Sequence, residues 1–413
     1  MRFDSILLHG KLKRSYAGGA TLPPISQVNA FKYNSAEELE AVFNHKRSGF
    51  AYTRIGNPSI NEFELRVQEL EGGVGAVATS SGMAAITNTI LNITASGEEI
   101  IMAKELYGGT IDLIKDLEKL GISVKRVDSL TKEAVQPLIN DKTRLIFGEF
   151  VSNPSQKVAN IPEISAVAHE NGIPIVIDST TVTPYSANPL KLGADIVIHS
   201  SSKYINGSGD AISGIIVYGG KFKWDFDKFT ALSEFRKFGS MAFLVRLRTD
   251  LWENMGSCLA PMNAYLNVIG IETLALRMER INKNAARLAS ALETEDVEVN
   301  HLSLESHPYH YLCEELLGGN GGGIMTIRAG SKEKAYSIIN NLKIPCIASN
   351  IGDVRTLVLH PASTIFNECS VEEREAAGVY DDTIRISVGI EDADDLIEDF
   401  IQAINISNGG KKE

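Results

Sequence analysis

The sequence predicts an α/β protein with a mostly parallel sheet covered by helices on both faces. From about residue 75, short apolar runs alternate with amphipathic segments of helical period, which is the rhythm of a parallel sheet. The 413 residues are too many for one ordinary core, so we expect two domains. A hydrophobic content of 44% and a charged content of 22% are typical of a soluble globular protein.

The elements are expected in the following order. Residues 1–60 have weak periodicity and are predicted to form an extended N-terminal arm. Apolar runs predict strands at residues 75–80, 99–103, 123–127, 143–150, 173–178, 194–200 and 212–219. Amphipathic segments between them predict helices at residues 81–93, 109–120 and 161–171.

A long helix and a second, smaller α/β unit are expected after the main sheet. Residues 267–293 are predicted to be helical and long enough to bridge two domains. Strands of the smaller unit are predicted at residues 322–330, 355–361 and 383–390. We therefore expect an arm over 1–60, a large domain over 61–255 and a small C-terminal domain over 256–413.

Composition excludes several classes of partner. The net charge of −12 argues against a nucleic-acid surface or an anionic membrane. No stretch approaches the roughly 18–20 apolar residues that a membrane span requires, and the N-terminus has no signal-peptide apolar region. The four cysteines include no close pair, which predicts neither a disulfide framework nor a zinc site. The expectation is a cytoplasmic protein without a metal.

Two motif-like fragments carry little weight. Gly73-Val-Gly75 resembles the start of a dinucleotide fingerprint, but it follows a predicted helix, whereas the fingerprint must follow a strand. His307 and His310 have near-metal spacing, yet Pro308 disrupts a helical presentation and no third ligand lies nearby.

Stronger candidates lie where predicted strands end. Ser80–Met83, Glu149, Asp178 and Ser200–Lys203 follow or end strands, and ligands of parallel sheets bind outside the carboxyl ends of the strands. Each has a structural alternative: Ser80 or Ser81 can cap a helix, Asp178 can cap a turn, and Lys203 can be a solvated lysine. Together, an amine, a carboxylate and an anion-binding helix start are what pyridoxal phosphate (PLP) requires, for its aldehyde, ring nitrogen and phosphate.

Six blocks in order extend this pattern over nearly the whole chain. They are AYTRIGNPS (51–59), SSGMAAI (80–86), ELYGGT (105–110), IDSTTVTPY (177–185), HSSSKYINGSGD (199–210) and IRISVGIED (384–392). In these blocks the chain resembles the Cys/Met-metabolism family of PLP-dependent enzymes. The resemblance implies PLP fold type I, PLP as the cofactor, and a homo-oligomer built from dimers, such as a tetramer.

The resemblance also implies roles for individual residues. Lys203 would form a Schiff base with the cofactor and act as the base, and Asp178 would pair with the ring nitrogen. Tyr107 would stack on the ring and also serve in acid–base steps, which makes these three the expected catalytic residues. The expected cofactor contacts further include Gly82, Met83, Asn153, Thr180, Ser200 and Ser202, with Tyr52 and Arg54 reaching the phosphate of a neighbouring subunit. Arg385, Asn350 and Tyr52 would bind the amino-acid substrate. Two departures from the family pattern are Ser208 in place of a histidine and Ser202 in place of a threonine.

Softer signals concern the reaction. Residues 220–224, 349–364 and 372–392 look most like the O-acetylhomoserine sulfhydrylase branch, which implies γ-replacement with sulfide or an equivalent donor such as a sulfur-carrier protein. Methionine γ-lyases carry cysteine where this chain has Gly109, which weakens the lyase reaction as a candidate. Cystathionine γ-synthase activity and a catalytically degenerate PLP-binding regulator also stay open.

Overall fold

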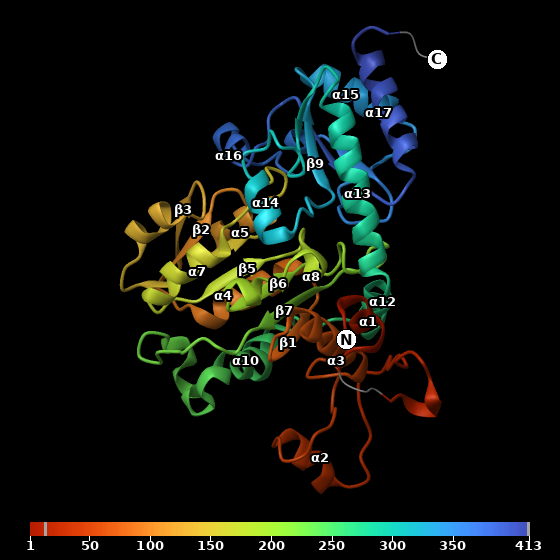
Figure 1. Cartoon of the computed structure of the whole chain (residues 1–413). Helices are drawn as coiled ribbons and strands as arrows, with labels where there is room; N and C mark the ends of the chain where they lie inside the picture. The colour runs from red at the N-terminus through yellow and green to blue at the C-terminus, as the bar shows by residue number, and fades with distance from the viewer. Residues whose placement is uncertain (12–14, 411–413) are drawn as a thin grey trace.

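The large sheet of the computed structural model, which describes residues 1–11 and 15–410, has seven strands. They are β1 Gly75–Thr79, β2 Glu99–Ala103, β3 Ser123–Val127, β4 Thr143–Glu149, β5 Ile175–Asp178, β6 Ile196–His199 and β7 Gly214–Tyr218. Their order is β1-β7-β6-β5-β4-β2-β3 (Figure 1). Only β7 runs antiparallel to its neighbours, and the other pairs are parallel. The predicted strands and the mostly parallel sheet are confirmed.

Helices and short turns pack around this sheet. The α-helices are α3 Pro58–Glu71, α4 Gly82–Ile93, α5 Gly108–Lys119, α6 Lys132–Val135, α7 Ile161–Glu170, α8 Thr183–Ser186, α9 Pro189–Leu192, α10 Ala242–Arg246 and α11 Trp252–Met255. 3₁₀ turns cover 136–138 and 230–241, and residues 247–251 are π-helical. Sequence signals fix the ends: α3 begins with an Asn57 cap and Pro58, and it ends at Gly72, which is left-handed at φ 74°.

The small domain has a five-stranded sheet in the order β10-β11-β12-β9-β8. The strands are β8 Glu298–Asn300, β9 Ile324–Arg328, β10 Cys346–Ile347, β11 Leu357–Leu359 and β12 Thr383–Ser387. Its helices are α14 His310–Leu317, α15 Lys332–Asn341, α16 Val371–Ala376 and α17 Ala393–Ser407, with a 3₁₀ turn at 361–363. The three strands predicted here are confirmed.

The predicted bridging helix is two helices, α12 Pro261–Glu272 and α13 Leu274–Leu292. Thr273 leaves helical dihedral angles (φ −109°, ψ 6°), which separates α12 from α13. The first half of α13 packs in the core of the large domain, and its second half packs in a separate core under the small sheet (Figure 1). The bridging role therefore belongs to α13, and the domain boundary at residues 255/256 stays a prediction.

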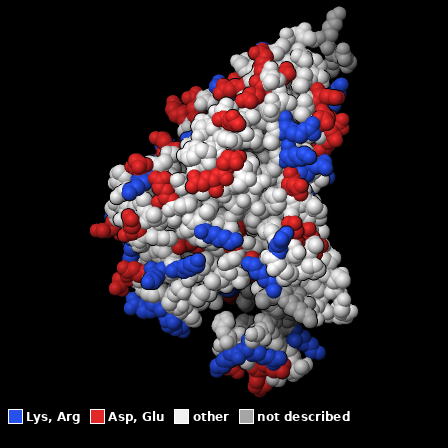
Figure 2. All heavy atoms as spheres, viewed as in Figure 1, with Lys and Arg blue, Asp and Glu red and all other residues white. Residues whose placement is uncertain are grey.

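The N-terminal arm differs from an extended chain because it contains two short helices and a 3₁₀ turn at 17–19. Helix α1 Phe3–His9 docks on the large domain through Leu7, which is 2% exposed, whereas α2 Ala36–Phe43 stands away from the body (Figure 1). Figure 2 shows acidic and basic side chains interspersed on one face of the molecule. Among the residues that the structure describes, no helix has the length and apolarity to cross a membrane.

Candidate active site

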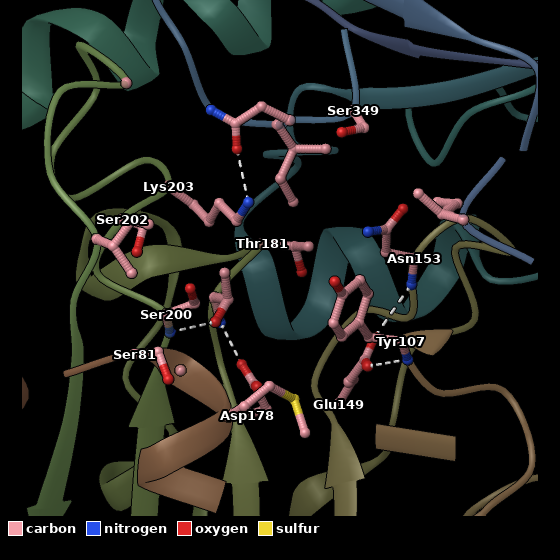
Figure 3. Close-up of a pocket in the computed structure, with 18 of the residues that line it drawn as sticks. Ser81, Tyr107, Glu149, Asn153, Asp178, Thr181, Ser200, Ser202, Lys203 and Ser349 are labelled. Atoms are coloured by element: carbon pink, nitrogen blue, oxygen red, sulfur yellow. Dashed lines mark hydrogen bonds between the residues drawn. The ribbon is translucent and has the colours of Figure 1, made fainter. Parts of the chain in front are cut away.

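A cavity of about 550 Å³ lies at the carboxyl ends of β4, β5 and β6, facing the small domain. All of the predicted site residues line it except Tyr52 and Arg54; those present are Gly82, Met83, Tyr107, Asn153, Asp178, Thr180, Ser200, Ser202, Lys203, Asn350 and Arg385. Figure 3 shows Lys203 and Tyr107 approaching the space from opposite sides, with Asp178 below. The structure thus brings these residues together, and their individual roles stay predictions.

The start of α4 lies at the end of the cavity that is predicted to bind the phosphate. Ser81 caps this helix by accepting a hydrogen bond from the Ala84 amide, so the capping alternative is correct for Ser81. Gly82 lies directly against Ser200, because a Cβ atom on Gly82 would be 2.6 Å from the Ser200 Cβ. The Ser200 amide is itself held by the Thr180 hydroxyl at 2.7 Å. These contacts fix the first turn of a helix beside Ser200, where free amide groups suit a phosphate.

Asp178 ends β5 and is buried at the floor of the cavity. One carboxylate oxygen accepts from the Thr180 amide at 2.9 Å, so the turn-capping alternative is also correct. Burial raises the pKa of Asp178, opposed by the Thr180 bonds and by His199. A buried carboxylate that is only partly compensated favours a cationic or proton-donating partner, such as a protonated ring nitrogen.

Lys203 lies in the loop after β6, and its Nζ donates to Oδ1 of Asn350 at 2.6 Å (Figure 3). Burial, followed by the nearby charge of Arg385, lowers the pKa of Lys203 to about 8. Arg385 is 3% exposed on β12 and donates from Nη2 to the Asn350 carbonyl at 3.0 Å. A lysine with a lowered pKa beside a buried guanidinium matches a site for a nucleophilic amine and an anionic substrate group.

Tyr107 and Asn153 come from loops after β2 and β4 and meet at Glu149. The Glu149 carboxylate accepts from the Tyr107 amide at 2.6 Å and from the Asn153 amide at 3.1 Å. Oδ1 of Asn153 is buried without a hydrogen-bond partner among the described residues. The sequence placed Glu149 at this edge of the sheet but assigned it no role, because no sequence signal marks a side chain that binds backbone amides.

Ser202 has a hydroxyl group that is already engaged. Its Oγ donates to the Ser213 carbonyl at 3.0 Å and accepts from the Ser213 amide at 2.8 Å. A serine hydroxyl has one proton, so Ser202 would have to release Ser213 before it could donate to a phosphate. Its predicted phosphate contact therefore needs a rotation that Ser200 does not need.

Tyr52 and Arg54 do not reach the cavity of their own chain. Tyr52 forms an isolated β-bridge with Ala30, and Arg54 donates to the Glu253 carbonyl at 2.9 Å. Their position outside the cavity agrees with the prediction that they serve a neighbouring subunit, which this single chain does not test.

The loop that carries Ser208 is ordered by another residue. Oδ1 of Asn206 accepts from the amides of Ser208 at 3.1 Å and Gly209 at 2.9 Å. Ser208 itself is exposed, and it contributes to these hydrogen bonds through its backbone amide, which a histidine would also supply.

The residues of the cavity fit PLP. Nε of Arg385 and Oδ1 of Asn153 are buried polar atoms without partners among the described residues, which is typical of a site that a polar ligand completes. The free helix start at Gly82, the buried Asp178 and the low-pKa Lys203 match the phosphate, ring nitrogen and aldehyde respectively.

Comparison with known proteins agrees with this fit. The family model described as Cys/Met metabolism PLP-dependent enzyme matches residues 4–405. An O-acetyl-L-homoserine sulfhydrylase of Corynebacterium glutamicum is 39% identical over 396 residues, which cover 91% of this chain and 90% of the relative. An L-methionine gamma-lyase of Fusobacterium nucleatum is 36% identical over 399 residues, covering 96% of this chain and 95% of the relative.

A solved structure has the same fold. It is a Campylobacter jejuni protein assigned as an O-acetylhomoserine (thiol)-lyase, with a TM-score of 0.93, 32% identity, and coverage of 98% of this chain and 100% of that chain. That protein carries N'-pyridoxyl-lysine-5'-monophosphate. The predicted resemblance, the fold class and the cofactor are confirmed.

Proposed function

Because the chain belongs to the Cys/Met metabolism family of PLP-dependent enzymes, we propose that it converts O-acetyl-L-homoserine and a sulfur donor to L-homocysteine and acetate. The observation that carries this proposal is the meeting of Lys203, Asp178 and Arg385 at one cavity, which pairs a reactive amine with a carboxylate and an anion-binding cation. The names of the Corynebacterium and Campylobacter proteins support this substrate class.

Lys203 is the proton-transferring group in this proposal. Bound PLP supplies an aldehyde that condenses with amines and a ring that accepts electron density from the substrate's Cα. Once its amine is free, Lys203 removes the Cα proton and relays it, and its pKa of about 8 keeps a substantial fraction neutral near physiological pH. Asn350 accepts from the same amine and holds it at the side of the cavity that faces Arg385.

In this proposal Arg385 orients the amino-acid substrate and Asp178 orients the cofactor ring. The guanidinium of Arg385 still has an unpaired Nε and binds the α-carboxylate of the amino acid, a task suited to its planar fork. The Asp178 carboxylate would hold the ring nitrogen of PLP, and its negative charge would keep that nitrogen protonated. These two contacts fix the substrate relative to Lys203.

The net reaction is a displacement at Cγ of the substrate. Acetate leaves with the electron pair of the Cγ–O bond, and the sulfur nucleophile supplies the pair of the new Cγ–S bond. Tyr107 is 44% exposed at the mouth of the cavity and stacks on the cofactor ring in this proposal. It is also placed to exchange protons with groups that enter from solvent.

Methionine γ-elimination is the second candidate, because one relative is a methionine γ-lyase. Gly109 argues against it, because the resemblance to this family implies a cysteine at this position in methionine γ-lyases, and this chain has no side chain there. We therefore propose sulfhydrylation as the main reaction and keep methionine elimination and cystathionine synthesis as alternatives.

A product assay with purified holoenzyme separates these reactions. O-acetyl-, O-succinyl- and O-phospho-homoserine are each combined with sulfide, a small thiol or cysteine, and methionine is tested alone. Homocysteine from O-acetylhomoserine and sulfide as the fastest reaction is the expected result, and loss of turnover in Lys203→Ala is the control. Faster 2-oxobutyrate release from methionine would contradict the proposal.

Three further properties belong to this proposal. The sulfur donor is sulfide or an equivalent, including a sulfur-carrier protein. The enzyme is a homo-oligomer built from dimers, and a tetramer is the expected form. Tyr52 and Arg54 support this, because they lie outside the cavity of their own chain. Light scattering of the purified protein would test the oligomeric state. A cytoplasmic location agrees with the four unpaired cysteines, and cell fractionation would test it.

A further inference from the structure

Glu149 occupies a central position that the proposed mechanism does not use. It is the last residue of β4 and lines the active-site cavity on one side and a smaller cavity of about 80 Å³ on the other. Its Oε1 accepts from the Tyr107 amide at 2.6 Å and its Oε2 from the Asn153 amide at 3.1 Å (Figure 3). One carboxyl group therefore ties together two loops whose side chains face the cofactor site.

The charge of Glu149 is constrained by its neighbour on the next strand. Glu149 pairs in register with Asp178, so the two carboxyl groups lie side by side at the end of the sheet. Burial, followed by the charges of Asp178 and, more weakly, Glu105, raises the pKa of Glu149 to about 8, although its two amide donors lower it. One of two adjacent buried carboxyl groups then keeps its proton near neutral pH.

We propose that Glu149 is a positioning residue that holds Tyr107 and Asn153 in place at the cofactor site. This inference rests on the proposed roles of those two residues. A protonated carboxyl group can still accept at both oxygens, so Glu149 keeps both loops in place while Asp178 carries the negative charge that the ring nitrogen needs.

The variant Glu149→Gln tests this inference without a change of shape. Its amide has a single acceptor oxygen, and its NH₂ group would face the second backbone N–H. Glu163→Gln is the matched control, because Glu163 also lines the smaller cavity and its carboxylate accepts from the Lys132 amide and the Asn160 side chain instead. Both variants are isolated as holoenzymes and compared with the wild type.

Two readouts need no amino-acid substrate, so they are independent of the proposed reaction. The first is the PLP dissociation constant, which should rise about fivefold in Glu149→Gln for the loss of one hydrogen bond. The second is the visible circular dichroism of bound PLP, which should change because the ring and Tyr107 shift relative to one another. Glu163→Gln should keep the wild-type values in both measurements.

Equal changes in the two variants, or wild-type affinity and dichroism in Glu149→Gln, would overturn the inference. If Glu149→Gln does not fold, hydrogen exchange of the wild-type holoenzyme gives a separate test. The amides of Tyr107 and Asn153 should then be protected together, and rapid exchange at either amide would count against Glu149 as the link.

Discussion

Nζ of Lys203 and Oδ1 of Asn350 lie 2.6 Å apart, which joins a loop of the large domain to a loop of the small domain. The carbonyl of the same Asn350 accepts from Arg385. The reactive amine and the proposed carboxylate-binding cation are thus held at a single residue, and neither has a carboxylate partner there. Burial, followed by the nearby charge of Arg385, lowers the pKa of the amine to about 8, so the protonation of Lys203 falls in a measurable range.

The rate at which the apoenzyme takes up PLP should depend on the protonation of Lys203. Only the neutral amine attacks the aldehyde, and burial together with the Arg385 charge lowers the pKa of Lys203 to about 8, below the usual value near 10.4. The rate constant should therefore rise about tenfold per pH unit below pH 8 and level off above it. Visible absorbance after mixing measures it. A rate that still rises up to about pH 10 would contradict this environment for Lys203.

Removal of the Arg385 charge should change two quantities separately. In Arg385→Met the midpoint of the PLP-uptake profile should move to higher pH, because a neighbouring cation no longer disfavours the charged lysine. The KM for the amino acid should also rise by about 10- to 100-fold, through the loss of charge-assisted hydrogen bonds. Arg385→Lys keeps the charge but not the planar fork, so it should raise KM while the uptake midpoint stays near wild type. If the midpoint of the PLP-uptake profile shifts equally in Arg385→Met and Arg385→Lys, the charge of Arg385 is not what lowers the pKa of Lys203.

The sequence predicted the part of the site that lies on the main sheet. Gly82, Asp178 and Lys203 each follow an apolar strand, and parallel strands bring their carboxyl ends to one edge, so local pattern was enough to place them together. The same reasoning reached Glu149. The hydrogen bonds from the two amides to Glu149 could not be predicted in this way, because they depend on loop conformations that side-chain periodicity does not encode.

The remaining part of the site comes from the second sheet. Arg385 and Asn350 lie well over a hundred residues beyond Lys203, and only resemblance to a family, not periodicity, connected them to the cavity. The break at Thr273 was also missed, because apolar residues continue in helical spacing across it and only the backbone dihedral angles of Thr273 interrupt the helix. The engaged hydroxyl of Ser202 is a tertiary feature of the same kind.

Gly82→Ala should weaken PLP binding. The new Cβ would lie 2.6 Å from the Ser200 Cβ and 2.9 Å from its Oγ, so the Ser200 segment must move away from the helix start. Overpacking of this kind costs about 1–3 kcal/mol, and we expect a PLP dissociation constant raised about tenfold or more. Titration of apoenzyme with PLP measures it, with Thr87→Ala on the same helix as a control. Wild-type affinity in Gly82→Ala would show that the phosphate binds elsewhere.

Arg277 should be required to hold the loop that carries Lys203. From α13 its guanidinium donates to the carbonyls of Tyr204 at 2.6 Å, Ile205 at 3.2 Å and Gly270 at 2.7 Å. Burial lowers the pKa of Arg277 to about 10, and the guanidinium is paired with these three carbonyl oxygens. A lysine cannot span three carbonyl groups, so Arg277→Lys should lose about 2–4 kcal/mol of stability and bind PLP more weakly.

Thermal unfolding of the holoenzyme and of the apoenzyme separates these two effects. The exposed Arg280→Lys on the same helix should leave the melting temperature of both forms unchanged. Arg277→Lys should lower both melting temperatures and also reduce the extra stability that PLP confers, because a misplaced Lys203 loop binds the cofactor less tightly. If the stabilisation by PLP is fully retained while the apoenzyme is destabilised, Arg277 supports the fold alone and does not position Lys203.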